Sequence, residues 1–312
     1  MAYRKPSPGG LSPATRITQE IIARLEAGTK PWVQPWRGVP VSRPLRACGI
    51  PYRGMNVFWL WMVADMCGYA SPYWMTYNQA KILGAQVRKG EKSTIAIFYK
   101  SYTKEVEAPD TGEKSDQARR VLKAYPVFNA DQVEGLPERF HPAVSLELVE
   151  PQGREAELDA FFAAIPVNLR LQGCEAYYEP TPDRVTMPPA SLFSGFDHYY
   201  ATLAHELSHW TGHSSRLARD LKNRFGTAAY AAEELVAELS SAMLGAELGL
   251  PVTHLDSHAS YIEHWLKLLR EDDRAILTAA AKAEEASSLL LKLGGRMIAD
   301  AAEEPEDVAL AA

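Results

Sequence analysis

The chain has 312 residues, of which 46% are hydrophobic, 23% charged and 10% aromatic, and its formal net charge is −6. This composition excludes wholesale disorder, collagen-like repeats and coiled-coil rods. Its three cysteines are too few for a disulfide framework or a cysteine-only zinc site, and no apolar run reaches the ~18 residues of a membrane span. We therefore expect a folded protein of the reducing cytoplasm, with no membrane partner.

The charge is divided unequally between the two halves of the chain. Residues 1–125 contain 19 Lys and Arg against 9 Asp and Glu, a net of +10, whereas residues 126–312 contain 14 against 30, a net of −16. A basic first half favours contact with a polyanion, although chance variation between domains is the simpler alternative. We expect a basic module joined to an acidic module with a different task.

Local patterns predict an α+β protein with two domains. The expected parts are a flexible arm (1–14), a small basic α+β domain (15–140), a mostly helical domain (150–298) and an acidic disordered tail (299–312). In the first domain, a helix is expected from Thr18 to Gly28, and the apolar segment 55–68 is expected to be a buried helix or strand. The charged segment 103–120 has few large apolar groups and is expected to be a solvent-exposed loop.

Helical patterns dominate the second half of the chain. Helices are expected at residues 154–165, 198–212, 228–249 and 260–272. The segment between the first two, at 174–189, has the pattern of a small β-hairpin.

The helix expected at residues 198–212 contains an HExxH motif. His205 and His209 are one helical turn apart, so both imidazoles can reach one metal ion. Glu206 lies near the same face and can act as the general base for an attacking water, which is the minimum for metal-assisted amide hydrolysis. Two simpler readings are that both histidines are ordinary helix residues, or that a metal only stabilises the fold.

Catalytic zinc sites use three protein ligands and leave one position open. His213 continues the helical series but lies too far from His205 for one metal to bind both. Downstream, Glu234 and Glu238 share a helix face, an arrangement similar to that of the gluzincins. Glu234 is expected to be the third ligand, and Glu238 is expected to hold a ligand histidine in its metal-binding tautomer. Glu233 is the rival for the ligand position. The expected metal is one Zn²⁺ ion, and another divalent transition metal is the alternative.

Two further features could assist such chemistry. His258 and Tyr261 are weak candidates for steadying the oxyanion, because a zinc hydrolase needs a donor opposite the base. Tyr177, Tyr178 and the strand-like segment 183–189 could present an edge that binds a peptide by strand addition, although hairpin packing is the commoner explanation.

The first domain interleaves aromatic and cationic residues. Base stacking on exposed aromatic rings beside cations that neutralise phosphates is the physical basis of single-stranded nucleic-acid binding. For the tryptophans, binding and core packing are equally good explanations. The candidate DNA contacts are Trp32, Trp36, Arg37, Arg43, Arg46, Tyr52, Arg53, Trp74, Tyr77, Lys81, Arg88, Lys89 and Lys92.

The combination resembles the ArdC-type antirestriction proteins. In the first half, the stretches 17–36, 51–61, 73–100 and 125–137 are similar to the N-terminal domain of that family. In the second half, 196–217, 230–249 and 258–269 are similar to its zincin-like metallopeptidase domain. The resemblance covers roughly residues 15–295. It implies a protein of mobile elements that binds incoming single-stranded DNA and helps it escape host restriction.

The resemblance implies a function but leaves rivals open. The leading hypothesis is a single-stranded DNA-binding antirestriction protein with a zinc peptidase domain, whose protein targets would be host restriction enzyme subunits or other DNA-bound proteins. The rival is a non-catalytic DNA-binding protein whose metal domain is structural or docks a partner. A weaker third option is a protease that removes proteins crosslinked to DNA.

Overall fold

The computed structural model describes residues 11–32, 42–107, 114–141, 153–221, 227–250 and 259–296. Most of the expected arm, the whole expected tail and the expected domain boundary fall outside these ranges. So do three of the candidate site residues, Trp36, Arg37 and His258. No helix within the described ranges is long and apolar enough to cross a membrane.

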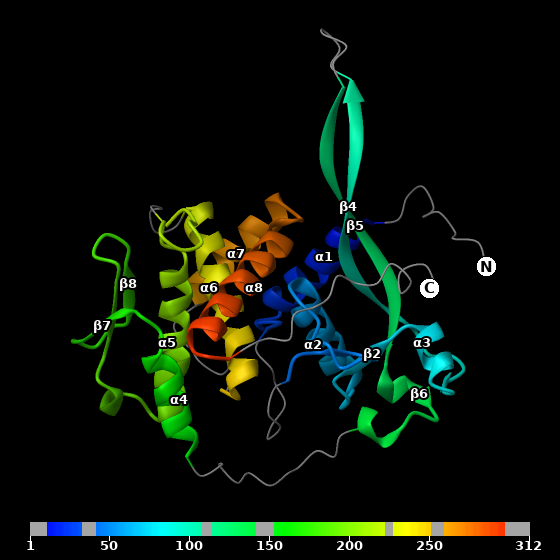
Figure 1. The fold of residues 1–312 in the computed structure, drawn as a ribbon, viewed down its shortest axis with the longest axis horizontal. Coiled ribbons are helices and arrows are strands. Elements are labelled where there is room, and N and C mark those ends of the chain that lie inside the picture. Colours follow the sequence, from blue (N-terminus) through cyan, green and yellow to red (C-terminus); the bar gives the residue numbers. More distant parts are fainter. Residues whose placement is uncertain are drawn as a thin grey trace.

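The N-terminal module, residues 11–141, combines short helices with a twisted sheet (Figure 1). Its sheet has the strand order β1-β2-β5-β4, and β3 pairs separately with β6. Its elements are α1 (Pro13–Glu26), β1 (Leu45–Arg46), α2 (Met55–Cys67), β2 (Tyr73–Met75), α3 (Tyr77–Ile82), β3 (Gln86–Val87), β4 (Thr94–Glu107), β5 (Lys114–Asn129), η1 (Ala130–Gln132), β6 (Val133–Glu134) and η2 (Glu138–Phe140).

Helix α1 begins earlier than the sequence pattern predicts. The side chain of Ser12 caps it by accepting from the backbone N–H of Thr15, and Pro13 occupies the first turn, where its missing N–H costs nothing. Thr18, the expected cap, is instead buried within the helix, and its hydroxyl donates to the backbone carbonyl of Asp273 at 2.7 Å. The prediction that Thr18 caps the helix is therefore wrong. Its hydroxyl bonds to a carbonyl 255 residues away in the chain, which the local sequence does not reveal.

The prediction of a solvent-exposed loop at residues 103–120 is also wrong. Strands β4 and β5 pair in antiparallel register along their whole lengths, from Thr94 opposite Val127 to Glu107 opposite Lys114. The resulting ribbon extends well beyond the helical body of the molecule (Figure 1). In a two-stranded ribbon the inner edges pair with each other and the outer edges remain open to water, so an exposed ribbon can form from polar residues.

The C-terminal module, residues 153–296, is mostly helical, as expected. Its small sheet has the order β7-β9-β8, with β8 antiparallel to β9, which confirms the expected hairpin. Its elements are α4 (Arg154–Ala163), β7 (Asn168–Leu171), β8 (Tyr177–Glu179), β9 (Arg184–Met187), η3 (Ala190–Leu192), α5 (Phe196–Thr211), α6 (Ala228–Leu248), α7 (Ala259–Glu271) and α8 (Ala275–Leu293). The last helix was not expected. The α+β class is confirmed.

One hydrophobic cluster joins the two modules. It contains Ile17 and Ile21 of α1 and most of α2, together with Leu235 and Leu239 of α6 and Ala280 of α8. Each module also has a smaller cluster of its own, but this one excludes water between apolar side chains of both modules and therefore couples them.

One ring pair and two ion pairs secure this junction. The ring of Trp32 packs edge-on against Trp265 of α7, with 5.4 Å between ring centroids, and both are buried. Arg43, which is 3% exposed, forms ion pairs with Glu247 of α6 at 2.7 Å and Glu284 of α8 at 2.8 Å. A buried guanidinium needs such partners, so these acids fix the position of Arg43 just before β1.

The shared core predicts the effect of Trp32→Ala. Removing this ring leaves a cavity at the junction, so the free energy of unfolding should fall by about 3–5 kcal/mol. Because both modules lose the same contact, urea unfolding followed by circular dichroism should remain a single transition at a lower midpoint.

Ile82→Ala is the matched control, because Ile82 is 84% exposed and its truncation should change stability little. Two separated transitions in the Trp32→Ala chain, with one at the wild-type midpoint, would contradict a common core.

Candidate metal centre and DNA-binding residues

Helix α5 presents His205 and His209 on one face, as the i, i+4 spacing predicts. Their ring centroids are 4.9 Å apart. The helix is fixed against α6 by a buried hydroxyl pair, in which Ser208 Oγ contacts Ser240 Oγ at 3.0 Å. Both imidazoles are thereby held against the adjoining helix.

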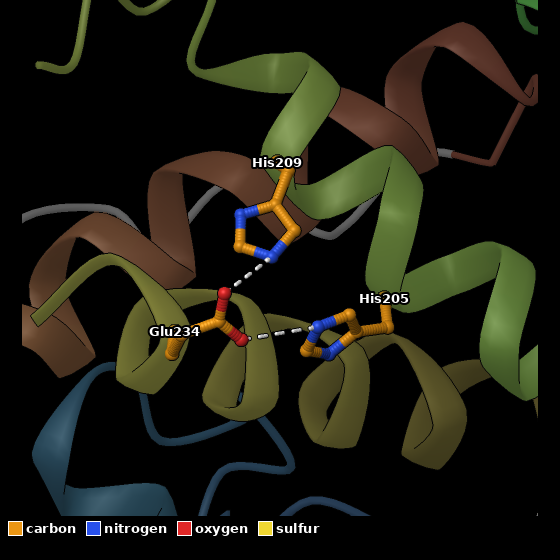
Figure 2. A group of neighbouring side chains, drawn as sticks. All are labelled: His205, His209 and Glu234. Atoms are coloured by element: carbon orange, nitrogen blue, oxygen red, sulfur yellow. Dashed lines mark ion pairs between the residues drawn. The ribbon is translucent and has the colours of Figure 1, made fainter. Parts of the chain in front are cut away.

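Helix α6 supplies the third member of the group. Glu234 Oε2 lies 3.6 Å from His205 Nε2, and Glu234 Oε1 lies 3.6 Å from His209 Nε2 (Figure 2). One ligand atom from each residue lies within 4.8 Å of the others. Ligands at ~2.1 Å from a tetrahedral zinc are separated by roughly 3.4 Å, so the donor set and its spacing fit a divalent transition metal.

Burial and opposite charges perturb the ionisation of this group. Burial favours the neutral imidazole, but Glu234 and Glu233 outweigh it and hold the pKa of His209 well above its usual value. The pKa of His205 is raised in the same sense, chiefly by its hydrogen bond to Glu234. Burial favours the neutral form of Glu234, but the two histidines lower its pKa overall. A metal must displace the protons on these histidines, so acid pH should oppose its binding.

Glu206 lies beside the two histidines with its side chain buried. Burial raises the pKa of its carboxyl group, and the charges of His205 and His209 only partly oppose that effect. The backbone N–H of Tyr178, on strand β8, donates to the same carboxylate. A carboxylate with a raised pKa, oriented by a backbone donor, is suited to take up and return a proton near neutral pH.

Glu233 supports His209 from outside the triad formed by His205, His209 and Glu234. Its Oε1 lies 3.3 Å from His209 Nδ1, and the guanidinium of Arg219 donates to the same carboxylate at 2.9–3.3 Å. Arg219 passes so close to Gly212 that a Cβ at residue 212 would lie 2.9 Å from Nη2. The glycine that follows the HExxH helix therefore makes room for the arginine that orients Glu233. Of the two candidates for the ligand position, Glu234 faces both histidines.

Glu238, which was expected to support a ligand histidine, has a different partner in the structure. Glu238 lies one turn beyond Glu234 but its Oε1 forms an ion pair with Lys30 of the N-terminal module, at 3.2 Å. Glu233, which lies outside the triad, contacts His209 instead. Sequence spacing places Glu234 and Glu238 on one helix face. It does not reveal that Lys30 of the N-terminal module reaches across to pair with Glu238.

The triad lies in a cleft of about 840 Å³. Strand β8 is an edge of its sheet, and Tyr177 and Tyr178 from this strand line the cleft. Tyr230 of α6 and Tyr261 of α7 line it as well, with their hydroxyls 3.1 Å apart. Tyr261 was expected near the site, whereas Tyr230 and Arg219 were missed. The position of Tyr230, one turn before Glu234 on the same helix, is the signal that could have identified it.

The candidate DNA contacts divide into buried and exposed groups. Trp32, Tyr52, Trp74 and Arg43 are each 3% exposed or less, so they do not offer an open face to a base or a phosphate. For the two tryptophans, core packing was the equal alternative. For Arg43 and Tyr52, a surface role is wrong, because Arg43 is held by acids from α6 and α8 and Tyr52 is packed in the shared core.

The remaining described candidates lie at least partly at the surface. Arg46 lies over the ring of Tyr52, 5.5 Å from its centroid, and Arg53 is half-buried. Tyr77 and Lys81 of α3 are exposed, as are the three cations of the basic turn, Arg88, Lys89 and Lys92. Arg88 pairs with Glu91 at 2.7 Å.

Comparison with known proteins covers both modules. One family model, described as the N-terminal domain of anti-restriction factor ArdC, matches residues 12–128, and another, described as a zincin-like metallopeptidase, matches residues 156–282. The metal-free crystal structure of the antirestriction protein ArdC from plasmid R388 matches with a TM-score of 0.77 and 44% identity, over 92% of this chain and 99% of that chain. The chain belongs to the ArdC antirestriction family.

Further relatives agree with this family assignment. The Mn(II)-bound structure of R388 ArdC matches with a TM-score of 0.75 and 43% identity, over 91% of this chain and 98% of that chain. The uncharacterised protein y4eC of Sinorhizobium fredii is 40% identical over 277 residues, covering 86% of this chain and 88% of y4eC. The DNA primase TraC of Escherichia coli is 38% identical over 301 residues, but the match spans only 27% of the primase.

The contacts of Glu233 and Glu238 predict different effects of their substitution on metal affinity. Glu233→Gln should weaken metal binding about 10- to 100-fold, because His209 loses the carboxylate that orients its ring. Glu238→Gln should leave metal affinity near the wild-type value, because its partner is Lys30. Isothermal titration with Zn²⁺ or Mn²⁺ measures both.

Glu234→Gln is the positive control, since it removes a ligand rather than a support. An equal loss of affinity in Glu233→Gln and Glu238→Gln would contradict the separate roles given to the two carboxylates.

Proposed function

We propose that this ArdC-family chain is an antirestriction protein that binds single-stranded DNA through its N-terminal module and cleaves proteins through its C-terminal module. The observation that carries the catalytic half is the position of Glu206 beside the His205–His209–Glu234 triad in an open cleft. A site that only stabilised the fold would need neither the buried base nor the cleft.

The residues around the triad suit peptide hydrolysis. A divalent metal held by His205, His209 and Glu234 would supply Lewis-acid polarisation of a peptide carbonyl. Glu206 accepts a proton from the attacking water and returns it to the leaving amine. The hydroxyls of Tyr230 and Tyr261 face the same cleft and can donate to the oxygen that gains negative charge.

Strand β8 gives the cleft a means of aligning a substrate. Because β9 lies between β7 and β8, one edge of β8 has no neighbouring strand among the described residues. An extended peptide can add to such an edge through backbone hydrogen bonds, which accept many sequences. This supports a protein rather than a small-molecule substrate.

The DNA-binding half rests on the exposed cations of the N-terminal module. Arg88, Lys89 and Lys92 occupy one turn, with Glu91 as the intervening acid. Cations grouped in this way neutralise phosphates without reading sequence. A protein that holds a DNA strand and a peptidase in one rigid body would raise the effective concentration of DNA-bound targets near the cleft, and host restriction enzyme subunits are targets of this kind.

Glu206→Gln separates catalysis from binding. It should abolish cleavage of DNA-bound proteins and antirestriction activity, because proton transfer is lost, whereas the affinities for metal and single-stranded DNA should stay within about twofold of wild type. Plasmid transfer into a restricting host, beside peptide-release assays, measures the outcome.

The rival function is protection by occupancy, in which the metal site is structural or docks a partner. It is supported by the joint core, since a metal that stabilises α5 against α6 would also stabilise the DNA-binding module. Full antirestriction by the Glu206→Gln protein would favour this rival over proteolysis.

Electrostatic binding predicts a salt dependence. For single strands, the slope of log affinity against log salt should fall by about 0.7 for each phosphate contact removed, so Lys89→Ala with Lys92→Ala should reduce the slope by about 1.4. Fluorescence anisotropy with a labelled oligonucleotide gives the slope.

Lys282→Ala is the matched control, because Lys282 is an exposed lysine on α8 of the other module. An identical slope in the double variant and the wild type would remove the basic turn from the interface.

A further inference from the structure

A second pocket, of about 240 Å³, lies in the N-terminal module and shares no lining residue with the metal cleft. Its walls come from α1, α2, the segment between α2 and β2, β2, the start of β4 and η1. Pockets for drug-sized ligands have volumes of ~300–1,000 Å³, so this one is sized for a single ring system rather than a whole nucleotide.

The pocket has fixed aromatic walls. Tyr69 and Trp74 meet edge-to-face, with 5.9 Å between ring centroids, and Trp59 is held by a hydrogen bond from Nε1 to the backbone carbonyl of Ile95 at 2.9 Å. Trp74 is buried at the base, whereas Tyr69 is half-buried and offers the more accessible ring. Rings already fixed in place lose little conformational freedom when a planar ligand packs on them.

The basic turn forms one rim of this pocket. Lys92 lines it, and Gln132 ties the turn in place by donating to Lys92 O and to Glu91 Oε2, both at 3.0 Å. Burial and, to a lesser extent, the neighbouring Cys67 thiol raise the pKa of Tyr69 to about 12, and Glu91 and Arg88 have smaller and opposing effects. A phosphate backbone attracted to the turn would pass the pocket mouth.

We propose that this pocket accepts one unpaired nucleobase of a single strand whose phosphates lie along the basic turn formed by Arg88, Lys89 and Lys92. The half-buried ring of Tyr69, held in place by Trp74, supplies the stacking surface that any base can use, and Lys92 neutralises the adjoining phosphate. Glu20 lines the pocket as well, so the backbone passes on the lysine side and the base occupies the interior, where the Glu20 carboxylate can accept from an N–H group on the edge of the base.

A base-binding pocket would favour single-stranded over duplex DNA, a preference that a basic surface alone does not give. Duplex DNA has the higher charge density, so a basic surface by itself favours the duplex. A pocket that admits a base only after it leaves its stack and its pair favours the single strand, because a duplex must first spend the energy of opening. The inference rests on the proposed single-strand binding and adds where and how a base is held.

Cys67 makes the pocket testable without disturbing the fold. Its thiol is exposed at the end of α2 and lines the pocket, whereas Cys48 is an exposed cysteine of the same module outside it. The Cys48→Ser, Cys174→Ser protein keeps only Cys67, and the Cys67→Ser, Cys174→Ser protein keeps only Cys48. Each folded protein is alkylated with N-ethylmaleimide, and modification is verified by mass spectrometry.

Binding is then measured by anisotropy with a labelled oligothymidylate and with an abasic sugar–phosphate strand of the same length. Before alkylation, the base-bearing strand should bind about tenfold more tightly than the abasic one. Alkylation of Cys67 should remove most of this tenfold difference without changing the affinity for the abasic strand. Alkylation of Cys48 should change neither affinity. In addition, the base-bearing strand should slow the alkylation of Cys67 but not that of Cys48.

Equal weakening for both strands, or no weakening, after Cys67 alkylation would overturn the nucleobase pocket while leaving single-strand binding intact. Failure of the unmodified protein to bind either strand at low salt would instead overturn the proposed DNA-binding function itself.

Discussion

The burial of helix α6 is the constraint on which the rest of the structure depends. This helix packs against α5, α7 and α8 and contributes to the hydrophobic cluster shared with the N-terminal module. Its two buried carboxylates, Glu234 and Glu238, cannot remain charged in that environment without partners. One is met by His205 and His209, and the other by Lys30. The same helix therefore fixes both the metal centre and the position of the N-terminal module.

The junction between the modules also reaches the cleft through aromatic rings. Trp32 contacts Trp265 edge-on, Trp265 stacks with Tyr261 at 6.1 Å between centroids, and Tyr261 meets the hydroxyl of Tyr230. Tyr230 in turn forms a hydrogen bond with Glu234. A contiguous set of packed rings thus links the end of the described N-terminal segment to a residue of the triad. This continuity makes the N-terminal module and the cleft parts of one packed structure rather than two tethered units.

Much of the fold could be predicted from local sequence. The hairpin at 174–189 and the HExxH helix follow from residue patterns, and the α+β class follows from their sum. The outer part of the β4–β5 ribbon, residues 103–107 and 114–120, could not be predicted in this way, because it forms by pairing between two polar segments and neither segment's composition indicates a strand. Helix α8 was not predicted, although its apolar positions recur at helical spacing and local sequence therefore contains the signal for it.

The sequence by itself determined what depends on neighbours within a few turns. The i, i+4 spacing of His205 and His209 places both rings on one face whatever the rest of the chain does. Tertiary structure decided everything that required a distant partner. Glu238 pairs with Lys30, 208 residues away in the chain, and Glu233 rather than Glu238 orients His209. Buried charges are stable only where opposite charges meet them, and which distant charges meet is set by the packing of whole helices.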